Sequence, residues 1–187
     1  STEPSPRIST DPDCRYSWYA RLFFANQRRR YGKELEPARL WARTPKVFAA
    51  LSLLYGALDR RRSPIEPALR SLITVRVSQI NWCAFCVDIN SATGLKRGIS
   101  DAQLAALPEF ATSPLFDERQ KAALAYAEAI TRTDVGVDDA LMARVKACFD
   151  DNAVIELTAL IAFQNMSSKF NAALDVAPQG FCRLPQK

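Results

Sequence analysis

The strongest constraint on the fold is a helix start signal that recurs along the chain. Thr44-Pro45 has the form of an N-cap residue followed by proline at the first helical position. Ser63-Pro64-Ile65-Glu66 repeats this pattern, and Ser100-Asp101-Ala102-Gln103 has the spacing of a capping box. Apolar residues after these signals recur with a period near 3.6, and no segment alternates convincingly with a period of two. The sequence therefore predicts an all-α protein.

Six longer segments carry these signals. Residues 64–80 include the β-branched Val75 and Val77, so a strand is the alternative there, but the length and the start signal favour a helix. The helix that begins near Cys83 is expected to end at Gly94, a C-cap candidate. We expect helices over residues 46–60, 64–80, 83–94, 117–132, 138–148 and 151–174, with no sheet.

Two residue counts exclude several classes of site. The chain contains 0 His, which excludes a Ser-His-Asp triad, a Cys-His dyad and a histidine zinc site. Only 6 Gly argue against a glycine-rich phosphate loop. The net charge is +5, and two arginine runs at 28–30 and 60–62 suggest either phosphate contacts or helix C-termini. We favour helix C-termini and expect no nucleic-acid partner.

The length of 187 residues predicts a single domain, 1–187, with residues 1–14 as a flexible N-terminal tail. That tail is polar and proline-rich and lacks the apolar region of a secretory signal. The longest apolar stretch, residues 48–58, is about half of the roughly 20 residues that a membrane span needs. We therefore expect a soluble, cytoplasmic protein with no membrane partner.

The sharpest local motif is Cys83-Ala84-Phe85-Cys86. At a helix N-terminus this spacing places both sulfur atoms on one face, and the positive end of the helix dipole favours the thiolate. Two such thiols can form a disulfide, so a peroxide can oxidise one sulfur and the other can resolve it. Asn90 shares the same helix face. The alternative is that both cysteines are small buried core residues.

Other roles for the cysteines have less support. A single C-x-x-C supplies two zinc ligands, and there is no second pair to complete a zinc site, so we expect no metal. Cys14, Cys148 and Cys182 each stand alone in the sequence and are expected to be structural.

Three segments resemble the carboxymuconolactone decarboxylase / alkylhydroperoxidase D-like superfamily. They are residues 72–90, which contain the C-x-x-C motif, residues 116–129, and residues 165–174. The resemblance spans residues 40–178, a family-like helical core. It implies a helical bundle of the alkylhydroperoxidase D-like type that assembles as a homo-oligomer. It also implies that the C-x-x-C is a redox dithiol in which the second cysteine, Cys86, attacks the peroxide and Cys83 resolves it.

The sequence departs from the peroxidase motif of that superfamily at two positions. Asn90 stands where the motif has His, four residues after Cys86, and Ser71 stands where it has Glu, twelve residues before Cys83. An amide does not titrate and a serine hydroxyl is a poor base, so the usual proton relay is missing. Asp88, Glu66 and a water molecule are the candidate replacements.

The function that these residues predict is a thiol-dependent peroxidase or a disulfide-reductase-like antioxidant protein. Cys83 and Cys86 would be its dithiol, with Asn90 and Ser71 as polar neighbours and no cofactor. The expected partners are a peroxide or small disulfide substrate and an unidentified thiol reductant. A non-catalytic or redox-sensing family member is one alternative, and a lyase of the carboxymuconolactone decarboxylase type is another. A homo-oligomer is expected, with one or both of two apolar segments, 150–174 and 18–24, at its interface.

Overall fold

The structure, a computed structural model, describes residues 6–10 and 15–182. Within these residues the chain is helical and contains no strand, as the sequence predicted. The elements in order are α1 (Trp18–Tyr31), α2 (Glu36–Trp41), α3 (Pro45–Leu58), α4 (Pro67–Ile80), α5 (Ala84–Lys96), α6 (Asp101–Ala106), a 3-10 turn (Leu107–Glu109), α7 (Glu118–Thr131), α8 (Asp139–Cys148) and α9 (Asp151–Ala173).

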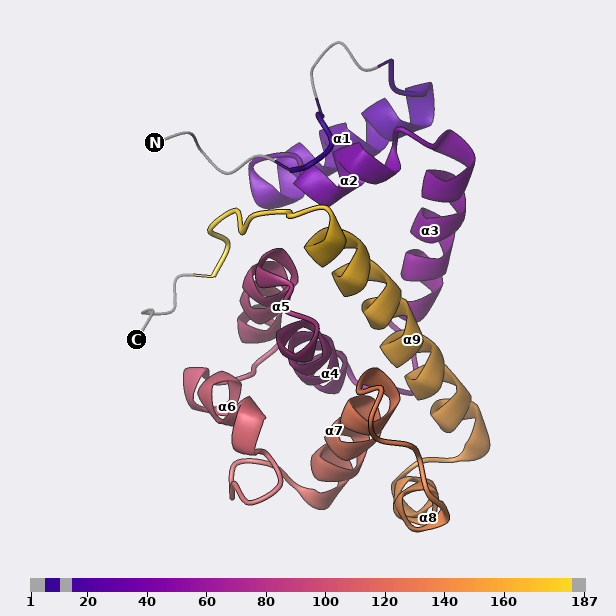
Figure 1. Cartoon of the computed structure of the whole chain (residues 1–187), viewed down its shortest axis with the longest axis vertical. Coiled ribbons are helices and arrows are strands. Elements are labelled where there is room, and N and C mark those ends of the chain that lie inside the picture. Colours follow the sequence, from indigo (N-terminus) through magenta and orange to yellow (C-terminus); the bar gives the residue numbers. More distant parts are fainter. Residues whose placement is uncertain (1–5, 11–14, 183–187) are drawn as a thin grey trace.

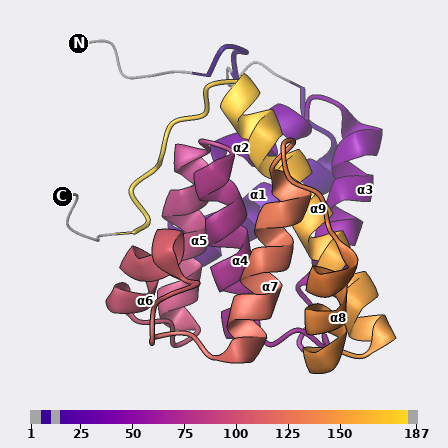
Figure 2. The same ribbon diagram turned by 60° about the horizontal axis from the view of Figure 1, so that its bottom comes forward.

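Helix α4 lies at the centre of the bundle and packs against α5, α7 and α9 (Figures 1 and 2). One side of α4 places Ile73 and Val77 in a core with residues of α7, α8 and α9. The other side places Leu72 and Val75 in a second core with α6, the 3-10 turn and α7. An amphipathic helix with a single apolar stripe has one buried face, whereas α4 is apolar on two faces because both are covered. A central α4 explains why its sequence also fitted a buried strand.

The first three helices gather at one end of the molecule (Figure 1). Phe24 of α1 and Phe48 of α3 are buried in a small aromatic core there. Trp41 of α2 stacks on Phe170 of α9, with ring centroids 3.7 Å apart, and so joins this end to the long C-terminal helix. The C-terminal segment then runs back past α5 (Figure 1).

Most of the expected helices are confirmed to within two residues at each end. Capping boxes at Ser100 and Asp117 begin α6 and α7, and Asp138 and Asp150 cap α8 and α9. The expected start at residue 64 was wrong, because α4 begins at Pro67. Glu66 precedes that second proline and is extended, with ψ 145°, since a residue before proline disfavours the helical conformation.

The expected end of α5 at Gly94 was also wrong, because the helix continues to Lys96. Gly94 is needed for packing instead. A Cβ at this position would lie 3.0 Å from the Cδ1 atom of Ile99 and 3.4 Å from the Cβ of Ser71. The left-handed residue comes later, at Gly98, with φ +90°. Gly94 therefore allows α5 to approach α4 closely.

The arginine runs lie at helix C-termini. Arg28 and the two arginines after it occupy the last turn of α1, and Arg60 donates to the Ala57 carbonyl at the end of α3. Cations are favoured there by the negative end of the helix dipole. No helix in the described part of the chain is long and apolar enough to cross a membrane.

Part of the segment expected to be a tail is described. Within residues 6–10, the backbone N–H of Arg7 donates to the Leu174 carbonyl, and the Thr10 hydroxyl bonds Glu36 of α2. Residues 1–5 and 11–14, the latter including Cys14, lie outside the described residues.

Candidate functional site

The two cysteines of the motif lie at the start of α5. Cys83 is the N-cap residue, and its sulfur accepts a hydrogen bond from the backbone N–H of Cys86 at 3.2 Å. A disulfide joins Cys83 and Cys86, whose Cα atoms are 5.3 Å apart. Just before it, Trp82 has a left-handed backbone with φ 55°, which is uncommon for a residue other than glycine. This turn connects α4 to α5 and exposes 89% of Trp82 beside the buried disulfide.

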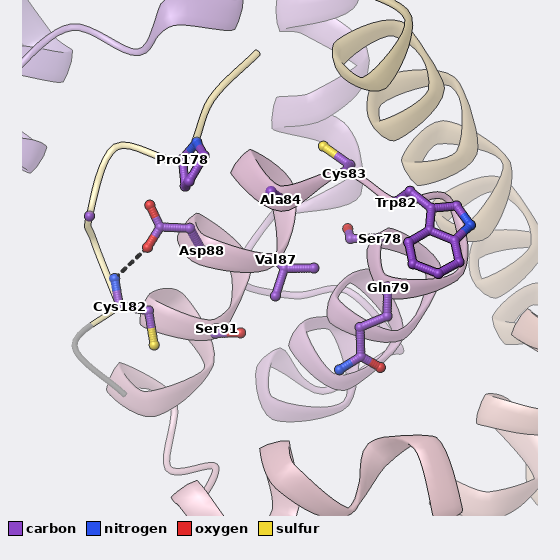
Figure 3. Close-up of a pocket in the computed structure, with 11 residues that line it drawn as sticks. Ser78, Gln79, Trp82, Cys83, Ala84, Val87, Asp88, Ser91, Pro178 and Cys182 are labelled. Atoms are coloured by element: carbon purple, nitrogen blue, oxygen red, sulfur yellow. Dashed lines mark hydrogen bonds between the residues drawn. The ribbon is translucent and has the colours of Figure 1, made fainter. Parts of the chain in front are cut away.

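The two sulfur-bearing residues differ in access. Both are only 2% exposed. Cys83 nevertheless lines a cavity of about 600 Å³ and a neighbouring one of about 270 Å³, whereas Cys86 lines neither. In Figure 3 the larger cavity lies between the start of α5, the end of α4 and the C-terminal segment. A small molecule in that cavity therefore meets Cys83 first.

The lining of the larger cavity is mostly uncharged. None of its eleven described lining residues is Lys or Arg, and Asp88 is its one carboxylate. Trp82, Ala84, Val87 and Pro178 give it apolar walls. Such a lining favours a neutral ligand over an anionic one, because an anion gains no cationic partner there.

Asn90 faces a neutral polar group. Its side-chain amide donates to the Ser78 hydroxyl at 3.5 Å, and Ser78 also accepts from Gln164 of α9 at 3.0 Å. Ser78 in turn donates to the Thr74 carbonyl. These groups link α4, α5 and α9 without a titratable side chain, and the amide of Asn90 donates to Ser78 rather than to a sulfur atom.

Ser71 lies at the other end of α4. It precedes Ser78 by two helical turns, about 10 Å along the axis. Its hydroxyl accepts from Arg97 at 3.3 Å, and its Cβ is the atom that Gly94 accommodates. None of the hydrogen bonds within the described residues joins Ser71 to Asn90 or to the cysteines.

The two carboxylates considered as replacement bases have other partners. Asp88 accepts backbone N–H groups from Gln179 and Phe181 at 3.0 Å and from Cys182 at 2.6 Å. Figure 3 shows its carboxylate turned toward Cys182. Glu66 forms an ion pair with Arg119 at 3.1 Å, at the N-terminal end of α4. Asp88 therefore anchors the C-terminal segment, and Glu66 lies far along α4 from the sulfur atoms.

The polar partner of Cys86 comes from α9. The side-chain amide of Asn171 donates to the Cys86 sulfur at 3.2 Å. Sequence reasoning did not single out Asn171, although a signal was present. Gln164, Ser168 and Asn171 have the spacing i, i+4, i+7, which places three polar residues on one face of a largely apolar helix, and all three are buried.

The remaining described cysteines are not bonded to the pair. Cys148 at the end of α8 and Cys182 in the C-terminal segment are free and partly buried. Cys182 lines the larger cavity. Within the described ranges, no group of three or more His, Cys, Asp or Glu residues is arranged to hold a metal ion.

Comparisons with known proteins agree with this geometry. Residues 45–129 match the model of the carboxymuconolactone decarboxylase family. The uncharacterized protein YnjA of Escherichia coli (strain K12) is 47% identical over 160 residues, which cover 86% of this chain and 88% of YnjA.

Solved structures share the fold. An uncharacterized peroxidase-related protein from Ralstonia eutropha JMP134, with an alkylhydroperoxidase AhpD core, superposes with a TM-score of 0.86 at 19% identity. The match covers 99% of this chain and 100% of the Ralstonia eutropha chain. A protein of unknown function from Agrobacterium tumefaciens, suggested to be the antioxidant defence protein AhpD, has a TM-score of 0.68 at 25% identity and covers 72% of this chain and 92% of its own.

Proposed function

The chain belongs to the carboxymuconolactone decarboxylase family, and on that premise we propose that it is a thiol-dependent peroxidase or disulfide reductase with an antioxidant role. The observation that carries the proposal is the Cys83–Cys86 disulfide at the N-terminus of α5, beside a cavity of about 600 Å³. The suggested antioxidant role of the Agrobacterium tumefaciens relative supports it.

The proposed reaction consumes one peroxide for each dithiol. A peroxide from the cavity passes Cys83 to reach the Cys86 thiolate, which the family resemblance assigns as the attacking sulfur. The thiolate attacks one peroxide oxygen, the O–O bond breaks, and the departing alkoxide or hydroxide takes a proton to leave as alcohol or water. The resulting sulfenic acid is attacked by the Cys83 thiol, which forms the disulfide and releases water. A thiol reductant then returns two electrons and two protons to the pair.

In this scheme the helix N-terminus activates the sulfur atoms, and the neutral side chains nearby take up no proton. Asn90 and Ser78 supply hydrogen bonds at the site but cannot carry a proton away. Ser71 is placed with Arg97 at the far end of α4. Protons are therefore exchanged with solvent in the cavity, and turnover is slow at neutral pH.

A redox-sensing role is the second candidate, and the same neutral surroundings favour it. A dithiol without a proton carrier still forms a disulfide when peroxide accumulates, but it cycles slowly. The lyase alternative is disfavoured because a lactone acid is anionic and none of the described residues that line the cavity is cationic.

A homo-oligomer is part of the proposal. Trp18 and Leu22 on α1, Leu53 on α3, and Ile155 and Met166 on α9 are large apolar residues exposed in the single chain. Exposed apolar faces of this kind are typical of subunit interfaces. We expect a multimeric mass by light scattering at micromolar concentration, and a monomeric mass would contradict this part.

The test of function combines thiol titration and peroxide consumption. Hydrogen peroxide should remove two thiols per chain from the reduced protein, and a dithiol reductant should restore them over repeated cycles. Two thiols lost in a single event without turnover would favour the sensor. No thiol loss would contradict both redox roles.

A further inference from the structure

Asn171 of α9 is a buried residue whose side-chain amide donates a hydrogen bond to one sulfur atom. It is 2% exposed, and its Nδ2 group donates to the Cys86 sulfur at 3.2 Å. Its Oδ1 atom is buried and has no hydrogen-bond partner among the described residues. Leaving a buried acceptor unpaired destabilises the folded protein, and a hydrogen-bond donor that faces Oδ1 would remove this cost.

The thiol form of Cys86 offers such a donor. A thiol S–H donates a hydrogen bond and a thiolate accepts one, and an amide can partner either form by presenting its oxygen or its nitrogen. In the disulfide the sulfur only accepts. The Asn171 amide can therefore form a hydrogen bond with Cys86 in its oxidised, thiolate and thiol forms.

The two sulfur atoms receive different donors. The backbone N–H of Cys86 at the helix N-terminus donates to the Cys83 sulfur, whereas the side-chain amide of Asn171 donates to the Cys86 sulfur. Cys83 also lines both cavities, and Cys86 lines neither. An incoming thiolate therefore reaches Cys83, and the electron pair must leave on Cys86.

We propose that Asn171 is a positioning residue that stabilises the Cys86 thiolate when a reductant opens the disulfide at Cys83, an inference that rests on the proposed redox function. A small dithiol attacks the Cys83 sulfur as its thiolate. A new S–S bond forms to Cys83, the Cys83–Cys86 bond breaks, and the Cys86 thiolate departs toward the Asn171 amide. The second thiol of the reductant then releases Cys83, and the reductant leaves as a cyclic disulfide.

Asn171 gives Cys86 a stabilising partner other than Asn90 and Ser71, the polar neighbours expected from the sequence. Asn90 occupies the position of the family's histidine, yet its amide donates to Ser78. Asn171 reaches the sulfur from a helix 85 residues further along the chain. A neutral donor lowers the free energy of the thiolate without itself exchanging a proton, so it replaces only part of what an imidazole provides.

The experiment compares Asn171→Leu with Asn165→Leu on the same helix. The amide of Asn165 bonds Asn81 and Thr131 but no sulfur, so it is the matched control. The first readout is the rate at which dithiothreitol reduces the disulfide. The second is the pH midpoint of Cys86 alkylation by iodoacetamide in a Cys83→Ser background, followed by peptide mass spectrometry to separate it from the other cysteines.

We expect Asn171→Leu to slow reduction about tenfold and to move the alkylation midpoint upward by about one pH unit, while Asn165→Leu changes neither. If Asn171→Leu does not fold, as judged by far-UV circular dichroism, Asn171→Ser carries the test, because its hydroxyl is too short to reach the sulfur. Unchanged rate and midpoint in a folded variant would overturn the proposal. Neither readout uses peroxide, so a failure of the peroxidase function would leave this result standing.

Discussion

The two ends of α4 organise their polar side chains in opposite ways. At the N-terminal end, buried Arg70 forms an ion pair with Asp59 at 3.1 Å, and Arg97 of α5 bonds the same carboxylate at 2.8 and 2.9 Å. Ser71 belongs to this group through its bond with Arg97. Formal charges of opposite sign meet here and hold α3, α4 and α5 together.

At the C-terminal end of α4 the polar groups that bond α5 and α9 are neutral, while Arg76 pairs with Glu128 of α7. Ser78 is bonded by Asn90 and Gln164, and Asn81 bonds Asn165 and Ser168 of α9. The disulfide begins within a few residues of this end. The difference teaches that ion pairs join α4 to the residue after α3 and to α7. The side chains that bond α4 to α5 and α9 near the redox pair are instead amides and hydroxyls, which can rearrange their hydrogen bonds without leaving a charge unpaired.

The largest expected effect is a loss of peroxide turnover when a cysteine next to the neutral end of α4 is replaced. Cys86→Ser should abolish peroxide turnover, and Cys83→Ser should allow one oxidation event and then turn over far more slowly, because only the added reductant can resolve the buried Cys86 sulfenic acid. Cys148→Ser, which removes a free cysteine on α8, is the control and should retain turnover. Peroxide consumption with a dithiol reductant measures all three, and turnover in Cys86→Ser would show that another group attacks the peroxide.

The next largest effect is a loss of stability when the ion pairs at the charged end of α4 are removed. Asp59→Ala removes the carboxylate shared by Arg70 and Arg97, and it should lower the free energy of unfolding by about 3 kcal/mol, because a buried guanidinium loses its partner. Glu118→Ala breaks an exposed pair with Arg144 and should cost less than about 1 kcal/mol. Urea denaturation gives both values. Equal losses would mean that the buried pair contributes no more than a surface one.

A smaller effect tests whether a proton carrier is missing at the neutral end. Turnover of the natural chain should rise steeply from pH 6 to pH 8, since only a minority of a weakly activated thiol is ionised at neutral pH. Asn90→His should raise the neutral-pH rate about tenfold and flatten the profile. A fast, flat profile for the natural chain, unchanged in Asn90→His, would show that another group already moves the proton.

Ser71 distinguishes the two ends directly. Because its hydroxyl accepts from Arg97 and contacts no sulfur, Ser71→Ala should change peroxide turnover by less than about twofold while slightly lowering thermal stability. A large loss of turnover with normal stability would show that Ser71 acts together with the dithiol and would contradict the functional difference between the two ends of α4. The combination of Asn90→His with Ser71→Glu shows whether a carboxylate at this distance assists an imidazole.

The smallest effect concerns an exposed pair between α9 and the loop after α3. The hydrogen bond from Arg60 lowers the pKa of Glu156 below its ordinary value of 4.5, and Ser63 adds to the shift. A lowered folded-state pKa gives stability that is present above pH 4.5 and is lost as pH falls through the folded value. Glu156→Gln should therefore be slightly less stable than the natural chain at pH 7, and the difference should shrink as the pH falls below 4.5. A stability difference that does not shrink below pH 4.5 would show that the substitution acts through packing instead.

Local sequence signals determined the secondary structure of this protein and the place of its dithiol. Caps such as Asp117 and Asp150 act on the backbone within three residues, so they can be interpreted without the fold. The C-x-x-C spacing likewise fixes two sulfurs one turn apart at a helix start. The signal at Ser63-Pro64 misled because a second proline, at position 67, decided where the helix begins.

Tertiary structure alone decided which polar group meets which sulfur. Asn171 and Cys86 are 85 residues apart, and Gln164 and Ser78 are 86 apart, so these bonds depend on how α9 crosses α4 and α5. No local rule fixes that crossing, because it follows from the packing of apolar faces over the whole bundle. The same packing separated Ser71 from the cysteines, although the family resemblance had implied a common site.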